Sequence, residues 1–480
     1  MYKYGIVVIG YKNEAGVVRL LNALGKADYE NEYITLIISI DKSDDTNVIK
    51  EAENFCWDFG DKHIMTFSKR IGLRNHVLYC GDYLNDYNLD AVVVFEDDMM
   101  PSRNFFSFVK VCTEKYVEMD NIAGISLYTH CINFTTGDRF IPIACDGDNY
   151  FFQCPQSRGQ VWFKKQWNEF REWYKSQGKL ESEYSIPSTV TSWPDTSWLK
   201  YHIKYCIEKN KYFVYPYISY STCFGDVGEH VKVQNNMLHV PLSNKHSKSF
   251  ELIEFNSDAL KYDAFFENQC LYKYCDVDKN DLLVDLYCDH TATNKRYILT
   301  KKKLPYRVKG SWGGNMIPHE LNIVYDIPGN DIFLYDLNND GKLVYLPKRE
   351  VKKDKMECYF DILDRWMQME ELGHYIYEYF TNNNWEHIAI YGKGKLGMHL
   401  YNKLKSTQVN VDYFIDKNTG ECKDDIKVIY PHDKMPEVDV VVVTPIMEYE
   451  VIKNILKNGG IENVISIDSI ISNNVGGIQQ

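Results

Sequence analysis

A short apolar run that ends in three adjacent carboxylates constrains the fold of this chain more than any other feature. Residues 91–95 read Ala-Val-Val-Val-Phe and predict a buried strand, and Glu96, Asp97 and Asp98 follow at once. Negative charge at the mouth of a buried strand calls for a cation, and carboxylate oxygens suit the hard ions Mg²⁺ and Mn²⁺. Mg²⁺ commonly shares its coordination shell with substrate phosphates, so the triplet predicts the handling of a diphosphate. The alternative is a solvated acidic turn after a core strand.

Strands and helices alternate on both sides of this run. We expect strands over 5–9, 33–40 and 91–95, with helices over 15–24, 73–84 and 104–116. This order predicts an α/β fold with a mostly parallel sheet. In such sheets ligands bind beyond the carboxyl ends of the strands, so the loop 10–14, Asp41 and the acidic triplet should meet at one crevice.

Length and charge narrow the class of protein. With 480 residues, 45% of them hydrophobic, the chain can form two or three domains. The 67 acidic and 54 basic residues give a net charge of -13, which argues against a nucleic-acid partner because phosphate binding needs a basic face. Thirteen cysteines without paired spacing, and a start without a signal sequence, indicate reduced thiols and a cytoplasmic protein. No apolar run approaches the roughly 20 residues of a membrane span, so we expect at most peripheral membrane contact.

Three motifs stand in order along the first 240 residues. Residues 74–76 read Arg-Asn-His, residues 92–106 run from the strand through the triplet to Phe105-Phe106, and residues 217–230 lead through Phe224-Gly225 to His230. This series resembles the glycosyltransferases of the GT-A fold, and within them it is similar to the N-acetylglucosaminyltransferase I-like family. The resemblance implies a mixed sheet with helices on both faces. It also implies a metal-dependent glycosyltransferase that inverts the anomeric centre.

The resemblance further implies a role for the residues at matching positions. Asp98 would be the direct ligand of Mn²⁺ or Mg²⁺, while Glu96 and Asp97 would contact the ribose or a nearby water. Asp41 would accept a hydrogen bond from the uracil imide, which implies a UDP-sugar as the donor. The other residues that we expect to bind the nucleotide-sugar are Tyr11, Asn13, Arg19, Arg74, Asn75, His76, Arg158 and Gly159.

Several of these roles have structural alternatives. Asp195 is the candidate catalytic base, because an acceptor hydroxyl must lose its proton as it attacks, but it can equally cap the following helix. His230 is a candidate metal ligand or a structural histidine. The loop with Arg158 and Gly159 either contacts the donor or lies at the surface.

Three tryptophans in the same region are predicted to belong to the core rather than to a sugar-stacking surface. They are Trp162, Trp167 and Trp173.

The middle of the chain gives weaker signals. We expect a transferase domain over 1–250 and a connecting or acceptor-binding region with β-hairpins over 251–350. Strands over 331–335 and 342–346 suggest one such hairpin. The turn between them imitates the start of a calcium loop, but Pro347 stands where the loop needs a bidentate glutamate.

A glycine motif marks the C-terminal region, 351–480. Gly392, Gly394 and Gly397 lie between a predicted strand and a helix, and Asp416 ends the next strand. This pattern predicts a small Rossmann-like α/β domain, preceded by a helix over 355–380. Nucleotide binding and a purely structural or assembly role are both open, and the helix can pack on a domain or on a second subunit of a homo-oligomer.

Three functions from different classes follow. The first is transfer of a sugar from a nucleotide-sugar to a hydroxyl of a glycan or lipid-linked glycan in surface polysaccharide biosynthesis. The second is a sugar-nucleotide pyrophosphorylase, which usually carries a Gly-rich, Arg-containing loop after the first strand; residues 10–16 do not fit it. The third is a nucleotide sensor or nicotinamide oxidoreductase built on the C-terminal glycine motif.

Overall fold

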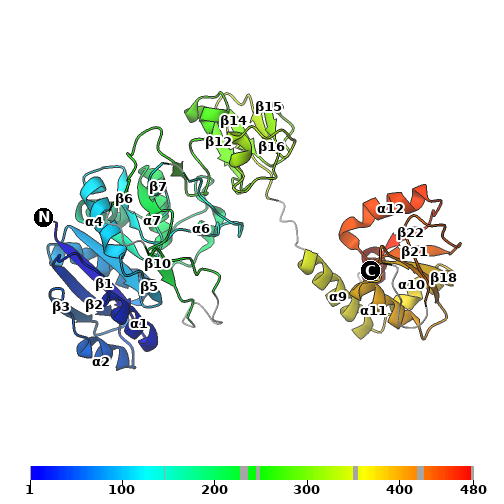
Figure 1. Ribbon diagram of the computed structural model, residues 1–480, viewed down its shortest axis with the longest axis horizontal. Helices are drawn as coiled ribbons and strands as arrows, with labels where there is room; N and C mark the ends of the chain where they lie inside the picture. Colours follow the sequence, from blue (N-terminus) through cyan, green and yellow to red (C-terminus); the bar gives the residue numbers. More distant parts are fainter. Residues whose placement is uncertain are drawn as a thin grey trace. The chain divides into compact units, whose positions relative to one another are not determined.

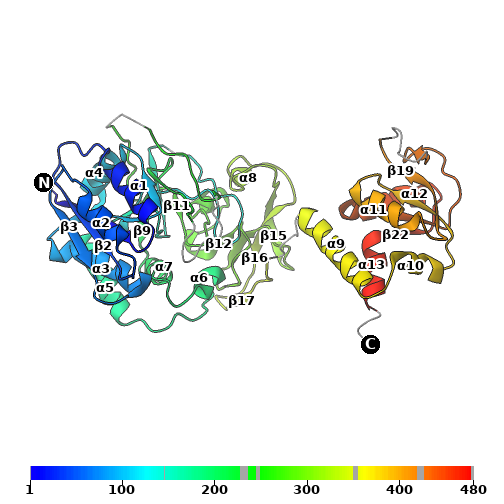
Figure 2. The ribbon, with the colours of Figure 1, turned by 90° about the horizontal axis from the view of Figure 1, so that it is seen from below.

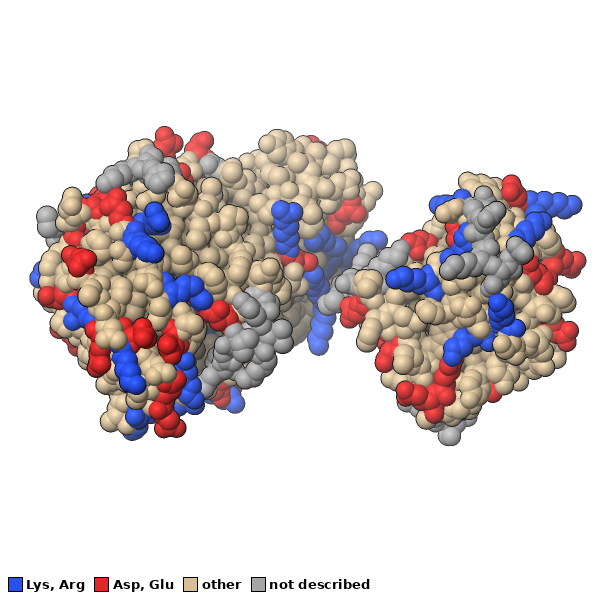
Figure 3. Space-filling view, turned by 60° about the horizontal axis from the view of Figure 1, so that its bottom comes forward, with Lys and Arg blue, Asp and Glu red and all other residues tan. Residues whose placement is uncertain are grey.

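The computed structural model describes residues 2–144, 146–226, 236–244, 249–349, 355–418 and 426–476. Its contacts divide the chain into two compact units, Met1–Arg349 and Glu350–Gln480 (Figure 1). Within the described ranges, no helix combines the length and the apolar character needed to cross a bilayer. On the face of the first unit seen in Figure 3, acidic and basic side chains are interspersed.

A nine-stranded mixed sheet forms the body of the first unit. Its order is β11-β7-β9-β6-β8-β4-β1-β2-β3, and β1 to β4 run parallel at one end. The antiparallel pairs β4 with β8, β8 with β6 and β9 with β7 make the sheet mixed. The strand bounds are β1 Tyr4–Gly10, β2 Ile34–Ile40, β3 Lys62–Thr66, β4 Ala91–Glu96, β6 Ile122–Ser126, β7 Asn149–Phe152, β8 Gln160–Phe163, β9 Tyr212–Pro216 and β11 Lys261–Tyr262.

Helices cover both faces of this sheet because its central strands are apolar on both sides. Along β1, Ile6 and Val8 pack into one core and Val7 and Ile9 into the other. The first core is closed by α1 Glu14–Leu24, α2 Asn47–Asn54 and α4 Phe105–Tyr116. The second is closed by α3 Gly72–Asp86, α5 Lys164–Lys175 and α7 Leu199–Glu208 (Figure 2). A strand buried on both faces has a continuous apolar sequence, as residues 91–95 do.

Smaller sheets complete the first unit. The strands β12 Leu282–Asp285, β14 Tyr297–Thr300, β16 Ile332–Asp336 and β15 Arg307–Trp312 form a four-stranded sheet in that order. Two further pairs join β10 Ser221–Cys223 to β5 Met99–Pro101, and β13 Ala292–Thr293 to β17 Val344–Tyr345. The short helices are α6 Ser188–Ser192, α8 Leu321–Val324, η1 Leu271–Tyr274 and η2 Lys279–Asp281. The predicted hairpin over 331–346 is wrong, because β14 and β15 occupy both edges of β16 and β17 pairs elsewhere.

The second unit is a five-stranded parallel sheet in the order β20-β19-β18-β21-β22. Its strands are β18 His387–Tyr391, β19 Asn410–Ile415, β20 Val428–Ile429, β21 Val440–Val443 and β22 Val464–Ser466. Its helices are α9 Lys355–Glu371, α10 Ile376–Asn382, α11 Lys395–Leu404, α12 Tyr449–Asn458 and α13 Ile467–Gly476, with the short η3 Ile446–Glu448. The single helix predicted over 355–380 is two helices, because the chain turns at Gly373 with φ +84°. The predicted α/β class, a mixed sheet with helices on both faces and a small Rossmann-like unit, is confirmed.

Candidate functional site

The carboxyl ends of β1, β2 and β4 lie side by side, as the alternation of elements predicted. The register pairs Ile9 with Glu96 and Gly10 with Ile40, so the segments that follow these strands start at one edge of the sheet. The Asn13 side chain accepts a hydrogen bond from the Gly16 amide at 3.0 Å and caps α1. A Cβ on Gly16 would lie 2.4 Å from the Asp97 carbonyl oxygen, so glycine lets the start of α1 approach the acidic triplet.

A cavity of about 590 Å³ opens at this edge. It brings together eight residues that the sequence predicted: Tyr11, Asn13, Asp41, His76, Glu96, Asp97, Asp98 and Arg158. It is also lined by residues that the sequence analysis did not single out, among them Arg70, Leu73, Ser157, Trp193, Trp198, Leu199 and Asp226. Four predicted residues, Arg19, Arg74, Asn75 and Asp195, do not line it, and neither does Gly159.

The three carboxyl groups of the acidic triplet are buried close together, which raises their pKa values. Burial, and then repulsion by Asp98 and Asp97, raises the pKa of Glu96 to about 8. Burial and the Asp98 charge raise the pKa of Asp97 to about 7, although hydrogen bonds from the Tyr11 amide and the Asn13 side chain oppose the shift. Burial also raises the pKa of Asp98, and the Arg158 charge opposes this. A cation beside these oxygens would offset the repulsion among them.

Asp226 adds a fourth carboxylate to this wall. It lines the cavity, and its charge contributes to the raised pKa values of Asp97 and Asp98. Arg19 on α1 forms an ion pair with Asp226 and lies 3.8 Å over the ring of Phe224. Arg19 therefore acts through Asp226 rather than from the cavity wall. Asp226 directly follows Phe224-Gly225, so its place in this motif could have marked it as a site residue from the sequence.

Asp41 and His76 line the cavity beside the start of α3. The buried Asp41 carboxylate accepts hydrogen bonds from the amides of Lys42 at 2.8 Å, Ile71 at 3.0 Å and Gly72 at 2.9 Å, where α3 begins. The His76 ring is buried and lies 2.8 Å from the Ser39 hydroxyl. Burial lowers the pKa of His76 to about 4, so the ring is neutral at physiological pH.

Tyr11 is flanked by cations. The Arg70 guanidinium lies 4.8 Å from the centre of its ring, and the Lys12 ammonium lies 5.0 Å from it. Both Tyr11 and Arg70 line the cavity, so they offer an aromatic face and a positive charge close to Asp41.

Arg74 and Asn75 do not line the cavity but hold segments that do. The Arg74 guanidinium donates to the Tyr174 hydroxyl at 2.6 Å and to the Asp195 carbonyl at 2.8 Å. The Asn75 amide donates to the Ile71 carbonyl at 2.9 Å. Arg74 thus ties the start of α3 to the segment 193–199, most of which also lines the cavity.

Asp195 lies beside the cavity wall rather than in it. Its neighbours Pro194 and Thr196 line the cavity, but its own carboxylate is 60% exposed and pairs with Lys200 at 3.1 Å. The hydrogen bond from Lys200 lowers the pKa of Asp195. The N-cap of α7 is Trp198, so Asp195 does not cap that helix.

Two tryptophans of the segment 193–199 line the cavity. Trp193 and Trp198 line the cavity, whereas Trp162 and Trp167 are buried and stack at 4.2 Å in the core, as predicted for them. Trp193 packs on Phe134, with ring centres 5.5 Å apart. The sequence prediction therefore placed Trp162 and Trp167 correctly and missed the two tryptophans at the cavity.

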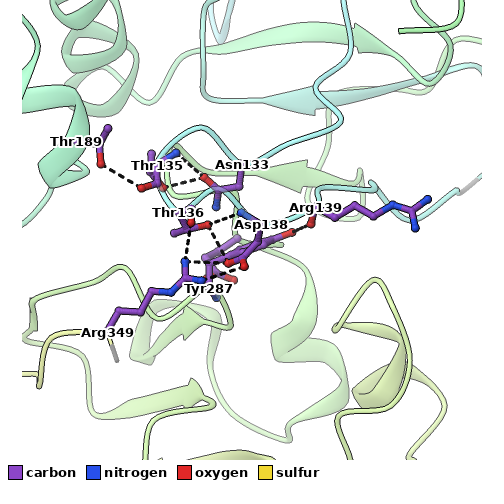
Figure 4. A network of polar contacts seen from close by, with 9 residues as sticks. Asn133, Thr135, Thr136, Asp138, Arg139, Thr189, Tyr287 and Arg349 are labelled. Carbon is purple, nitrogen blue, oxygen red and sulfur yellow. Dashed lines mark hydrogen bonds and ion pairs between the residues drawn. The ribbon is translucent and has the colours of Figure 1, made fainter. Parts of the chain in front are cut away.

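A polar network supports the loop that carries Phe134 (Figure 4). Arg349 reaches this loop, with an ion pair to Asp138 at 2.8 Å and a hydrogen bond to the Thr136 carbonyl at 3.2 Å. Thr189 on α6 donates to the Thr135 carbonyl at 3.1 Å. The loop, α6 and the cavity wall that follows α6 are therefore held together by residues far apart in the sequence.

Gly159 lies behind the cavity wall. Its φ is +86°, and an added Cβ would lie 2.7 Å from the Ser221 hydroxyl and 2.9 Å from the Phe95 ring. Its neighbour Arg158 lines the cavity with its guanidinium 5.2 Å from the centre of the Tyr128 ring. His230, the other predicted metal ligand, lies outside the described residues.

The donor atoms of the site suit a hard cation. In the described ranges, no three His, Cys, Asp or Glu side chains gather closely enough to hold a metal ion by themselves. The carboxylates at the wall, with their raised pKa values, fit a cation that takes one or two protein ligands and completes its shell with phosphate oxygens.

The glycine motif of the second unit has the local geometry of a tight strand-to-helix turn. Gly392 has φ +99°, and a Cβ on Gly397 would lie 2.0 Å from the Gly392 carbonyl oxygen. A Cβ on Gly394, by contrast, would meet nothing within 4 Å. Asp416 accepts a hydrogen bond from the Lys393 amide at 2.6 Å and so supports the turn itself.

Comparisons with known proteins add little. No family model and no curated protein matches the chain. Among solved structures, S. aureus TarS 1-349 in complex with UDP-GlcNAc aligns at 13% identity over 48% of this chain and 61% of that one, with a TM-score of 0.31. The mannosyltransferase PcManGT from Pyrobaculum calidifontis, in complex with GDP-Man and Mn²⁺, aligns at 11% identity over 45% and 57%, with a TM-score of 0.29. The chain thus spans about three fifths of each of these two structures, and TM-scores this low carry no argument about its site.

Proposed function

We propose that the first unit is a metal-dependent glycosyltransferase that binds a nucleotide-sugar in the cavity at the acidic triplet. One observation carries this proposal. Five carboxylates, two arginines and two tryptophans line a single cavity at the carboxyl ends of parallel strands. The acids would bind a divalent cation, Arg158 would contact the diphosphate, and Trp193 and Trp198 would face the sugar or its acceptor.

The lone pairs of Asp41 favour UDP as the nucleotide. Its Oδ1 already accepts from the Lys42 and Ile71 amides and its Oδ2 from the Gly72 amide, which leaves room for one further donor on Oδ2. Uracil offers a single imide N–H at its Watson–Crick edge, whereas guanine offers two adjacent donors. The base would stack beside Tyr11, with Arg70 on the same side.

Mn²⁺ or Mg²⁺ fits the donor set. Asp98 is the proposed ligand, and a cation bound there would favour the ionised forms of Glu96 and Asp97, whose pKa values are raised by burial and by repulsion among the carboxylates. When bound, the ion would stabilise the charge that develops on the departing nucleoside diphosphate. Arg158 lies on the same wall and would neutralise a further part of that charge.

The acceptor hydroxyl would approach from the wall formed by residues 193–199. An inverting transfer needs a base on the side opposite the leaving diphosphate, and Asp195 is the proposed base on that side. It is ionised because Lys200 pairs with it, so it can accept a proton once the acceptor lies within reach. A glycan hydroxyl in surface polysaccharide biosynthesis, free or lipid-linked, is the proposed acceptor.

Incubation of the purified chain with UDP-sugars and Mn²⁺ tests the proposal. Release of UDP that depends on the metal would support a transferase. Exchange of pyrophosphate into the nucleotide-sugar would support a pyrophosphorylase instead. A change in nicotinamide absorbance would support an oxidoreductase built on the second unit.

A further inference from the structure

A second cavity of the first unit lies beside β11, the edge strand of the large sheet. Its volume is about 400 Å³, within the range of about 300–1,000 Å³ that is usual for ligand sites. It is lined by the segments that lead into β7 and β11 and by residues of η1 and α8. Among the described residues, none lines both this cavity and the one at the acidic triplet.

Strand direction places the second cavity at the same edge of the sheet as the acidic triplet. The strands β4, β6 and β9 run in one direction, and β7 and β11 run against them. The starts of β7 and β11 therefore lie at the edge where β4 ends. In the sheet order β11 is five strands from β4, or roughly 24 Å at the usual strand spacing. A chain-like substrate several units long can span this distance.

Contacts between distant parts of the chain hold the second cavity in shape. The Tyr262 hydroxyl on β11 donates to the Glu320 carboxyl at 2.8 Å, and Glu320 is the N-cap residue of α8. The Ile253 amide donates to the Asn149 side chain at the start of β7, at 3.0 Å. A cavity fixed in this way loses little conformational entropy when a ligand enters.

Apolar side chains and a tyrosine line the second cavity. Leu260, Leu271 and Val324 contribute apolar surface to it. Tyr274 also lines it and is 50% exposed, so part of its ring is accessible to a ligand. A tyrosine ring presents an apolar face and a polar hydroxyl, and it therefore suits a ligand that is itself both apolar and polar.

The charged groups of the second cavity disfavour an anion. Three acids, Asp146, Glu254 and Asp258, line it together with one basic residue, Lys273. Lys273 pairs with Asp258 at 2.8 Å, and Glu254 pairs with Lys115 at 2.7 Å. Asp146 is exposed and has no ion pair in the described part of the chain. Its carboxylate can accept hydrogen bonds from a ligand hydroxyl.

Asn256 adds hydrogen-bond donors to this cavity. Its Oδ1 accepts from the amides of Asp258 at 2.9 Å and Ala259 at 3.0 Å, which fixes the orientation of the side chain. These two bonds do not use the N–H groups of Nδ2, which can donate to a ligand hydroxyl. The cavity thus offers an acceptor, donors and apolar surface together.

We propose that the second cavity binds a neutral sugar residue of the acceptor glycan, remote from the hydroxyl that reacts. This inference rests on the proposed transferase function. A sugar ring has a face of C–H groups, which fits Tyr274 and the apolar side chains, and hydroxyls that fit Asp146 and Asn256. Binding of one residue of a glycan here would raise the effective concentration of its other residues at the donor cavity.

Saturation-transfer NMR on the full chain tests the proposal. The probes are glucose, galactose, mannose and N-acetylglucosamine, each added without nucleotide or metal. We expect saturation transfer to at least one of them. The 6-phosphate of the sugar that binds is the matched anionic probe, and we expect it to bind more weakly because of the three acids.

Variants of the chain locate the bound sugar. Tyr274→Ala should raise the dissociation constant of the sugar at least about fivefold. The matched control is Tyr79→Ala, because Tyr79 is 52% exposed on α3 and lines neither cavity, and this variant should leave the constant unchanged. Asp98→Asn should also leave it unchanged, since Asp98 lines the other cavity. Circular dichroism checks folding, and Asp146→Asn replaces Tyr274→Ala if that variant is not folded.

Four results would overturn the proposal. They are no saturation transfer to any of the four sugars, equal binding by the wild type and Tyr274→Ala, loss of binding in Asp98→Asn, and binding of the 6-phosphate at least as tight as that of the neutral sugar. The third would place the sugar in the donor cavity instead.

Failure of the proposed transferase function gives a different result. Calorimetry with UDP and Mn²⁺ measures the donor cavity alone, and Tyr274→Ala should leave that affinity within about twofold of wild type. A chain that binds UDP but none of the sugars contradicts this inference only. A chain that binds a sugar at Tyr274 but no UDP retains the sugar site and contradicts the transferase.

Discussion

The Asp195 carboxylate does not line the cavity, although its neighbours Pro194 and Thr196 do. Lys200 holds it at 3.1 Å, and Lys179 lies 3.7 Å from its other oxygen. The sequence could not show these contacts in advance, because a lysine five residues away gives the same pattern whether the acid is a base, a cap or an ion pair.

The substitution Asp195→Asn separates catalysis from donor binding. If Asp195 accepts the acceptor proton, kcat should fall by about 100-fold or more. The dissociation constant of UDP should stay within about twofold, because the carboxylate does not touch the cavity. Steady-state kinetics and calorimetry measure the two quantities. An unchanged kcat would assign the base to another residue.

Glu320 gives the first unit a titration near neutral pH. Burial raises the pKa of its carboxyl to about 7, and it accepts a hydrogen bond from the Tyr262 hydroxyl at 2.8 Å. An unfolded glutamate has a pKa near 4.3, so the folded state binds the proton more tightly. The resulting stability is fully present below about pH 4.3 and is lost as the pH rises through 7.

The variant Glu320→Gln should therefore lose this pH dependence while it keeps an oxygen acceptor for Tyr262. From pH 5 to pH 8, the free energy of unfolding of the variant should rise relative to wild type by on the order of 2–3 kcal/mol. Urea denaturation at the two pH values measures the difference. Other buried acids such as Asp263 are present in both proteins, so their effect on stability cancels in the comparison. Parallel pH curves for the two proteins would contradict the assignment.

At the scale of elements, the local pattern of apolar residues correctly predicted the strands and helices whose position depends on that pattern alone. The strands β1, β2 and β4 and the helices α1, α3 and α4 lie within one or two residues of their expected ranges. The triplet and the loop after β1 were found because each follows an apolar strand directly. Strand β8, which separates β4 from β6, was missed because its place depends on antiparallel pairing across more than 60 residues.

The cavity wall at 193–199 was missed for the same reason. Trp193 and Trp198 belong to it because Arg74 and Phe134 hold that segment from other parts of the chain. Nothing in the local sequence distinguishes them from Trp162 and Trp167, which are core residues. Long-range contacts therefore decide which tryptophans line the cavity.

Gly159 allows the approach of β10 to the end of β4, and a paired substitution measures this. Gly159→Ala and Gly137→Ala both place alanine at positive φ, +86° and +78°. Only the Cβ at 159 meets Ser221 and Phe95, while the Cβ at 137 meets nothing within 4 Å. Gly137→Ala should cost about 1 kcal/mol and Gly159→Ala about 1–3 kcal/mol more. Equal losses in thermal unfolding would show that the contact at 159 relaxes without cost.

At the scale of the whole molecule, every residue proposed to bind the donor belongs to the first unit. The supports of the cavity wall also belong to it, including Arg349 at its end. A chain of residues 1–349 should therefore fold and bind UDP within about twofold of the affinity of the full chain. Calorimetry on both proteins checks this. Much weaker binding by the shorter chain would mean that the second unit contributes to the donor site.

The binding of a nucleotide diphosphate through a cation at the acidic triplet is tested most directly by calorimetry with UDP and Mn²⁺. The wild-type chain and the variant Asp98→Asn are compared, with Asp58→Asn as control, since Asp58 is an exposed acid just before β3 at the other edge of the sheet. We expect UDP to bind the wild type and the control only with Mn²⁺ or Mg²⁺ present, and Asp98→Asn to weaken this binding by about 100-fold or more. No association of UDP with the wild type in the presence of either ion, or equal binding by Asp98→Asn, would contradict the proposed site.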